Sequence, residues 1–218
     1  MTEIVNVSKP AGQDGITTAE LVIATAVTGV LVLIGVPVAD DARRAAELSR
    51  AAAQVHGLLV RCRATAVLRS RTCAVVFNPE AGGRWHCFVA EDGDGDGVRR
   101  SDVSSGTDPT VGPVLSLEAG AAGPGILEGP VPDPSGSGVL GGDLSDPIRA
   151  GLGNIISFTA RGTATPSSVY LTERARRMVV FRVYGGTGRI NRLRCCLLYT
   201  SPSPRDLVGN LVWRLVVV

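Results

Sequence analysis

The longest apolar run of the chain lies close to its N-terminus. Residues 21–39 read LVIATAVTGVLVLIGVPVA and contain no charged residue. A helix of this length spans about 28 Å, which matches the hydrocarbon core of a bilayer. The run follows a polar segment, residues 1–15, whereas a secretory signal peptide carries its positive charge and short apolar core nearer the start. We therefore expect a membrane-spanning helix over residues 16–39.

Beyond Asp40 the pattern becomes one-sided. Apolar positions recur three or four residues apart, as on one face of an amphipathic helix. These positions are Leu48, Ala52, Val55, Leu59, Cys62 and Ala66. Arginines occupy the other faces, and we interpret them as a solvated surface. The pattern predicts that residues 40–71 continue the apolar helix as a stalk and pack one stripe on a soluble domain.

Residues 72–195 show the two-residue period of β-strands. The first two strands, residues 73–78 and 85–90, flank a Gly-containing turn and are expected to form a hairpin. Further strands are expected at residues 114–117, 155–159, 168–172, 178–184 and 189–193. Residues 104–153 contain 19 Gly or Pro among 50 positions, so we expect mainly loop there, around one or two short strands. A long helix followed by six to eight short strands predicts an α+β fold, with the helix packed on an antiparallel sheet or a small sandwich.

The composition adds few constraints. Hydrophobic residues make up 44% of the 218 positions, which excludes a wholly disordered chain. Aromatic residues make up only 4%, so the core must consist mainly of aliphatic side chains. The formal net charge of +2 selects no class of partner. The two histidines, His56 and His86, lie far apart without a Cys/His group, so we expect no zinc site.

The polar segment and the apolar run meet at the sequence Gly15-Ile16-Thr17-Thr18-Ala19-Glu20. A carboxylate at the edge of a membrane span is costly and usually functional. The arrangement resembles the class III leader of type IV prepilins and type II secretion pseudopilins, with residues 1–15 as the leader. The resemblance implies that a membrane peptidase cuts after Gly15 and methylates the new N-terminus, Ile16. It also implies that Glu20, the fifth mature residue, acts in subunit assembly. Ile16 stands in place of the usual Phe or Met, and Asp14 in place of a basic residue.

The strand region is similar to the GspH/FimT-type minor pseudopilins. The similarity rests on an F-x-x-x-G strand end at residues 158–162 and on a closing strand that begins Gly188-Arg189. It covers roughly residues 10–194 and implies a pilin-like fold and a non-enzymatic subunit of a periplasmic pseudopilus in type II protein secretion. It further implies a single-pass protein of the bacterial inner membrane with a periplasmic C-terminal domain. The implied partners are other pseudopilins in a helical filament, the prepilin peptidase/N-methyltransferase, the inner-membrane assembly platform and membrane lipid.

Two other functions stay open at the level of the sequence. One is a minor pilin of a type IV pilus, including one that binds DNA for natural transformation. The other is a periplasmic binding domain on an uncleaved membrane anchor. Family members used in DNA uptake carry a Gly-Arg-x-Arg pattern, whereas the fourth position here is Asn191. Arg189, Arg192 and Arg194 are candidates for phosphate contacts, but we interpret them as solvated strand ends and expect no nucleic-acid partner.

Two further groups of residues are candidate sites. Cys73 and Cys87 fall on the two hairpin strands and are candidates for a disulfide in an oxidising compartment, with buried free thiols as the alternative. The run Asp92-Gly-Asp94-Gly-Asp96-Gly97 matches the first half of a calcium loop. Its twelfth position holds Val103 in place of a bidentate Glu. We therefore expect a solvated turn rather than a calcium site, and no cofactor.

The C-terminal residues have a different character. Residues 196–206 read CLLYTSPSPRD and resemble a translated transposase-type sequencing adapter. We therefore exclude residues 196–218 from the fold prediction and expect them to make no stable contact with the domain. The alternative is a genuine apolar C-terminal segment.

Overall fold

The structure is a computed structural model that describes residues 16–117, 122–128, 131, 133–134, 138–151, 153–197 and 211–216. Residues 196–197 and 211–216 are described by their backbone alone. The chain divides into two compact units, residues 1–42 and 43–218, which we describe separately. Helix α1 (Thr18–Arg69) contributes residues to both units.

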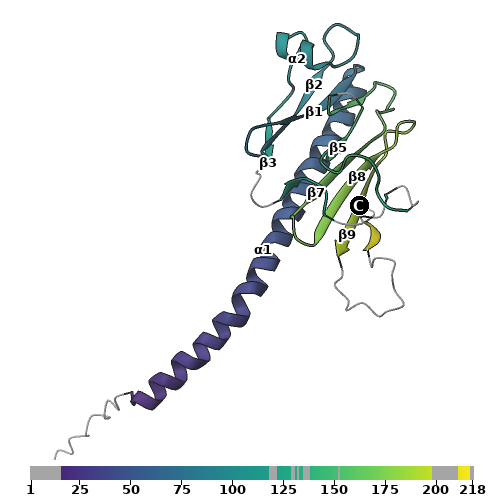
Figure 1. Ribbon diagram of the computed structural model, residues 1–218. Coiled ribbons are helices and arrows are strands. Elements are labelled where there is room, and N and C mark those ends of the chain that lie inside the picture. The colour runs from purple at the N-terminus through teal and green to yellow at the C-terminus, as the bar shows by residue number, and fades with distance from the viewer. Residues whose placement is uncertain are drawn as a thin grey trace, which may run out of the picture. The chain divides into compact units, whose positions relative to one another are not determined.

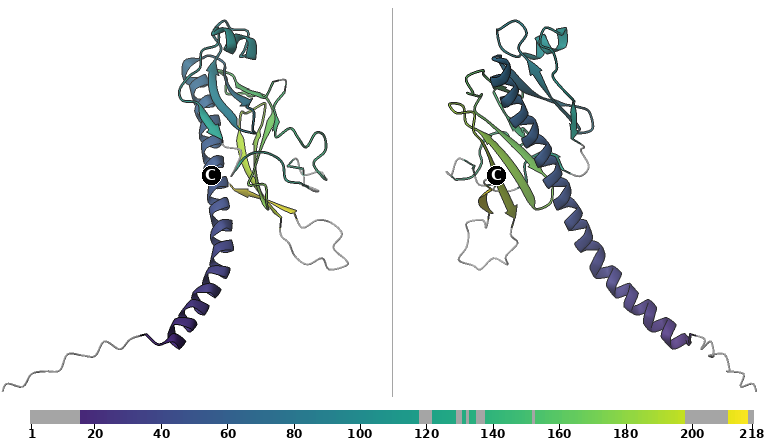
Figure 2. Two further views of the ribbon diagram at one scale, coloured as in Figure 1. Left: turned by 60° about the vertical axis from the view of Figure 1, so that its left-hand side comes forward. Right: turned by 180° about the vertical axis from the view of Figure 1, so that it is seen from behind.

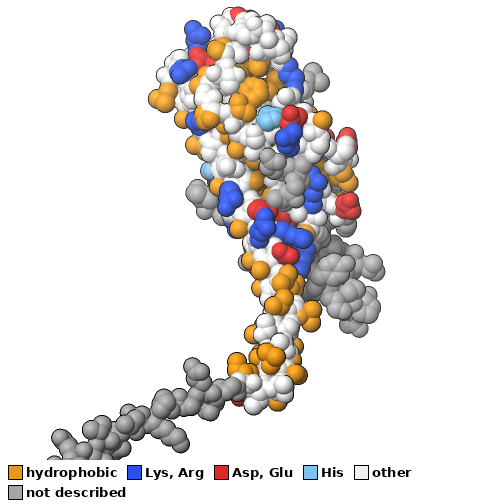
Figure 3. All heavy atoms as spheres, turned by 90° about the vertical axis from the view of Figure 1, so that its left-hand side faces the viewer, with side chains coloured by type: hydrophobic (Ala, Val, Ile, Leu, Met, Phe, Trp, Pro, Cys, Tyr) orange, Lys and Arg blue, Asp and Glu red, His pale blue; other side chains and the backbone are white. Residues whose placement is uncertain are grey.

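In the first unit, the side chains in the apolar part of α1 are not buried by other described residues. Its large hydrophobic side chains are exposed, for example Leu33 at 77%, and they cover this part of the helix in Figure 3. Within the described residues, α1 is the one helix long and apolar enough to cross a membrane. This part of α1 is therefore compatible with a single membrane span, because exposed apolar side chains of this kind are stable in lipid and costly in water.

In the second unit, α1 buries one stripe. All six apolar positions that the periodicity singled out are buried, and they are joined by Ala51 and Leu58. The predicted amphipathic stretch is therefore confirmed. The helix ends at Arg69, and Arg69 and Arg71 form ion pairs with Glu91 at the end of the second strand.

The first sheet has the strand order β3-β2-β1-β6 and is antiparallel throughout. Its strands are β1 (Cys73–Pro79), β2 (Trp85–Glu91), β3 (Leu115–Leu117) and β6 (Ile155–Phe158). Strands β1 and β2 form the expected hairpin, whose turn places Gly82 and Gly83 at φ of 84° and 77°. Only glycine adopts such φ values without strain, which explains the Gly-Gly pair.

The second sheet has the order β10-β9-β8-β7-β4, and β5 also pairs with β7. Its strands are β4 (Gly123–Pro124), β5 (Ile148–Arg149), β7 (Ser167–Thr172), β8 (Arg177–Val183), β9 (Ile190–Leu197) and β10 (Leu211–Val216). Figure 1 shows α1 running along these strands. Figure 2 shows the β1–β2 hairpin on one side of the helix and the second sheet on the other.

The main core lies where the stripe of α1 meets the inner faces of both sheets. Phe77 of β1, Phe158 of β6 and Phe181 of β8 are its largest side chains and are fully buried. Two smaller clusters cover the opposite faces. One places Leu127, Val131 and Leu140 of the Gly/Pro-rich segment on Tyr170, Met178 and Val180, and the other packs Val98 on Ala74, Val76 and Ala90. The loops therefore complete the core.

The predicted α+β fold is confirmed, and the sequence missed only short or terminal elements. The helix α2 (Arg100–Ser105) and the two-residue strands β4 and β5 are too short to show a period. The expectation that residues 196–218 make no contact with the domain is wrong, because β10 pairs with β9 over six residue pairs. The physical reason is the open edge of β9, whose unpaired backbone groups accept an apolar strand such as LVWRLV.

Candidate functional site

The residues expected to act in assembly lie at the start of α1. Thr17 precedes the helix, and both its backbone N–H and its hydroxyl donate to Oε2 of Glu20 at 2.9 Å. In return, the backbone N–H of Glu20 donates to Oγ1 of Thr17 at 3.3 Å. This reciprocal arrangement is a capping box, which satisfies N–H groups that have no partner within the helix.

The capping box gives Glu20 a defined position. Ile16 is 80% exposed and lies one residue before the cap, whereas the predicted cleavage position Gly15 lies outside the described residues. Both bonds from Thr17 reach one oxygen of Glu20, so in the described part of the chain Oε1 is left for another donor. Our reading of the sequence missed Thr17, although the spacing Thr-x-x-Glu is a recognised sign of this cap.

The aspartate loop follows β2 and is organised by its own backbone. Asp92 is buried, and its two oxygens accept from the N–H groups of Gly95 at 2.7 Å and Gly97 at 3.1 Å. The buried Asp108 accepts from the N–H groups of Gly93 at 3.0 Å and Arg99 at 3.1 Å. These carboxylates therefore hold the shape of the turn through hydrogen bonds from backbone N–H groups.

The three candidate calcium ligands of this loop have oxygens within 4.8 Å of one another. Hydrogen bonding to the Asp96 backbone lowers the pKa of Asp94, while desolvation and then the hydrogen bond with Asp94 raise the pKa of the exposed Asp96. Asp96 also forms an ion pair with Arg99. Each of the three carboxylates has a partner, and the preference for a solvated turn over a calcium site stays our prediction.

The candidate disulfide between Cys73 and Cys87 is not formed. The hairpin register places Cys73 opposite Glu91 and Cys87 opposite Phe77, so the two cysteines are four positions out of register. Four residues of a strand span about 13 Å, far beyond the separation that a disulfide bridges. Both residues are buried free thiols, which was the alternative reading. The sequence could not fix this register.

The structure brings together two of the three arginines near the C-terminal strand. Arg192 and Arg194 lie on β9 and line one cavity, whereas Arg189 lies in the turn before the strand and does not line it. The interpretation of all three as solvated strand ends fits Arg189 and Arg194, which are exposed. It is wrong for Arg192, which is half-buried.

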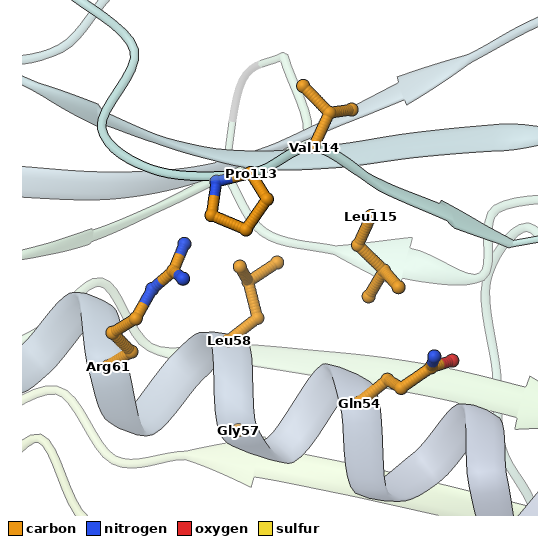
Figure 4. Close-up of a pocket in the computed structure, with 7 residues that line it drawn as sticks. All are labelled: Gln54, Gly57, Leu58, Arg61, Pro113, Val114 and Leu115. Atoms are coloured by element: carbon orange, nitrogen blue, oxygen red, sulfur yellow. The ribbon is translucent and has the colours of Figure 1, made fainter.

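A second cavity separates α1 from the segment that leads into β3. It has a volume of about 260 Å³. Figure 4 shows Leu58 reaching from the helix toward Pro113 and Leu115, with Gln54 and Arg61 on either side. Arg61 donates to the backbone carbonyl of Val111 at 3.4 Å. This shallow groove has an apolar floor and no cluster of reactive groups among its lining residues.

The described residues thus present a capped helix start and arginine-lined and apolar cavities around a β domain. The family model for the type II transport protein GspH matches residues 51–186, more than half of the chain. The chain belongs to the GspH family. Comparison with curated proteins and with solved structures gives no match.

Membership of the GspH family accounts for the architecture of the second unit. The match covers α1 from residue 51 onward and the strands from β1 to β8. It describes a pseudopilin-like subunit of type II secretion, a structural role rather than an enzymatic one, which implies association with other pseudopilins. The match ends before β9 and β10 and begins after the assembly residues, so those sites rest on their own geometry.

Proposed function

We propose that this GspH-family chain is a minor pseudopilin, a structural subunit of the short periplasmic filament of a type II secretion system. The match to the GspH model carries the proposal. The exposed apolar half of α1 supports it, because the precursor must reside in the inner membrane before assembly. The β domain is then periplasmic.

Processing would follow the leader motif. The prepilin peptidase cuts after Gly15, and its methyltransferase activity modifies the amine of Ile16. The assembly platform then extracts the subunit into a bundle of helices. There the carboxylate of Glu20 pairs with the methylated amine of a neighbouring subunit, which offsets the cost of burying both charges and fixes the axial register. Oε1 of Glu20, which has no donor among the described residues, supports this role, since a carboxylate can serve Thr17 and a second donor together.

Coexpression with a prepilin peptidase tests the processing step. The mature chain should lack the 15 leader residues and begin at a methylated Ile16, as intact-mass measurement and peptide sequencing would show. A Gly15→Leu variant should keep its leader and serve as the uncleaved reference. Persistence of the leader in the unchanged chain, next to a processed control pilin, would favour an uncleaved anchor instead.

A second measurement separates secretion from a type IV pilus. In-membrane cross-linking should join the processed chain to the other pseudopilins encoded with a type II secretion system. Cross-links only to pilins of a type IV pilus would identify the alternative system. The β domain is compatible with a pseudopilus and with a type IV pilus, so the cross-linked partners distinguish the two systems.

A further inference from the structure

The cavity lined by Arg192 and Arg194 has an unusual composition. It has a volume of about 270 Å³. Its lining from α1 consists of Ala45, Leu48 and Ser49, and its lining from β8 and β9 consists of Arg177, Met178, Val179, Arg192, Arg194 and Cys195. We call it the arginine cleft. It combines an apolar floor with three guanidinium groups, and its lining contains no acidic residue.

The strand register explains why two arginines face the helix. Arg192 lies opposite Phe181 and Arg194 lies opposite Val179 on β8. Directly paired residues share a face of the sheet, and Phe181 and Val179 belong to the main core beneath α1. The apolar Leu193 packs on the other face. Arg192 and Arg194 therefore lie on the same face of the sheet as the core residues with which they pair on β8.

The charge of Arg192 is not balanced within the described residues. Nε and Nη2 of Arg192 are buried and have no hydrogen-bond partner. Burial and the neighbouring Arg194 both lower the pKa of Arg192, yet a guanidinium remains charged at any physiological pH. By contrast, Arg177 forms an ion pair with Glu173 at 3.2 Å. A buried charge without a partner is costly and calls for an anion.

We propose that the arginine cleft binds the phosphate headgroup of an anionic phospholipid at the membrane surface. Guanidinium groups bind phosphate oxygens in pairs of hydrogen bonds, and Leu48, Met178 and Val179 offer contacts for the adjoining glycerol and first methylenes. The lining begins at Ala45, six residues after Ala39, where the charge-free run ends. Six residues extend at most about 20 Å, so Ala45 lies within that distance of the end of the charge-free run.

This inference depends on the proposed membrane insertion but not on leader processing or filament assembly. The bound headgroup would hold the β domain of the precursor against the membrane until the assembly platform extracts the subunit. Inward-pointing charges can also discourage pairing at a sheet edge, but β9 is paired with β10 here. Charges in that role can be satisfied by solvent. By contrast, Nε and Nη2 of Arg192 are shielded from water.

The test uses the full chain in a non-ionic detergent and follows the midpoint of thermal unfolding as lipid is added. A ligand that binds only the folded state raises this midpoint. Phosphatidylglycerol should raise it by several degrees, and phosphatidylcholine should not. The rise should disappear in an Arg192→Gln/Arg194→Gln variant. It should persist in the matched control Arg161→Gln/Arg176→Gln, which removes two exposed arginines outside the cleft.

Without lipid, the cleft variant should unfold at the same temperature as the unchanged chain or a higher one, because it loses an uncompensated buried charge. If that variant does not fold, Arg192→Lys keeps the charge but loses the paired hydrogen bonds, and native mass spectrometry should then show fewer bound phosphatidylglycerol molecules.

An equal rise in the cleft variant and the unchanged chain would overturn the proposal. Stabilisation by inorganic phosphate that matches phosphatidylglycerol would show a site for free anions. Selective stabilisation by duplex DNA would show a nucleic-acid site instead.

Discussion

At the scale of single residues, the thiols of the hairpin show how burial sets chemistry. Cys87 is fully enclosed in the main core, and this burial raises the pKa of its thiol to about 12. Burial also raises the pKa of Cys62 and, with a further contribution from Glu91, that of Cys73. Because the thiolate is the reactive form, these groups are inert while the domain is folded.

The raised pKa predicts a loss of stability at alkaline pH. Between an unfolded pKa of about 9 and the folded value of about 12, the unfolded chain loses the Cys87 proton and the folded chain keeps it. The contribution of this thiol is complete below pH 9 and declines above it, by at most about 1.4 kcal/mol per pH unit. Urea unfolding in a reducing buffer from pH 7 to pH 11 should show the decline.

A Cys87→Ala variant isolates this effect from other groups that titrate in the same range. The variant should be less stable at pH 7 because it leaves a cavity, and the difference from the unchanged chain should shrink as the pH rises above 9. If the difference in unfolding free energy between the two proteins stays constant up to pH 11, the raised pKa of Cys87 is not the cause of the decline.

At the scale of elements, α1 carries both buried and exposed leucines on one continuous helix. Leu59 is fully buried in the main core, whereas Leu68 is 83% exposed. Leu59→Ala should lower the free energy of unfolding by about 2–5 kcal/mol, because it removes packed methyl groups and leaves a cavity. Leu68→Ala is the matched control and should change it by less than about 0.5 kcal/mol. Chemical unfolding of both variants measures the contrast, and equal effects would mean that α1 is not docked by this stripe.

Strand β10 provides a second prediction at this scale. The described core clusters extend no further along the chain than Cys195, and the match to the GspH model stops at residue 186. A chain ending at Cys195 should therefore keep its circular dichroism spectrum and its cooperative thermal transition. It should also associate more readily, because the edge of β9 becomes open. Loss of the transition would show that residues 196–218 are an integral part of the fold.

At the scale of the whole molecule, the question is how a monomer becomes part of a filament. Glu20→Ala should still be cleaved and inserted into the membrane, since the carboxylate makes its only described contacts with Thr17. Under the proposed pairing, assembly should fail, because the amine of a neighbouring subunit loses its partner when it is buried. Cross-linking to other pseudopilins measures this loss, with Glu47→Ala on the same helix as the control. Normal incorporation of the Glu20→Ala subunit would remove the pairing from the mechanism.

The sequence by itself determined the elements whose signals are local. The charge-free run, the stripe from Leu48 to Ala66 and the alternating strands of the hairpin each carry a period that one segment displays alone. The Thr17–Glu20 cap also has a local signal, a spacing of three residues, although our reading of the sequence missed it.

Only the tertiary structure decided what depends on register and on contacts between distant segments. The four-position offset of Cys73 and Cys87 follows from the pairing of β1 with β2, which alternation does not specify. The placement of Arg192 and Arg194 beneath α1 follows from the pairing of β8 with β9. In each case the sequence supplies the side chains, while the partner strand sets the face, the burial and hence the chemistry of the group.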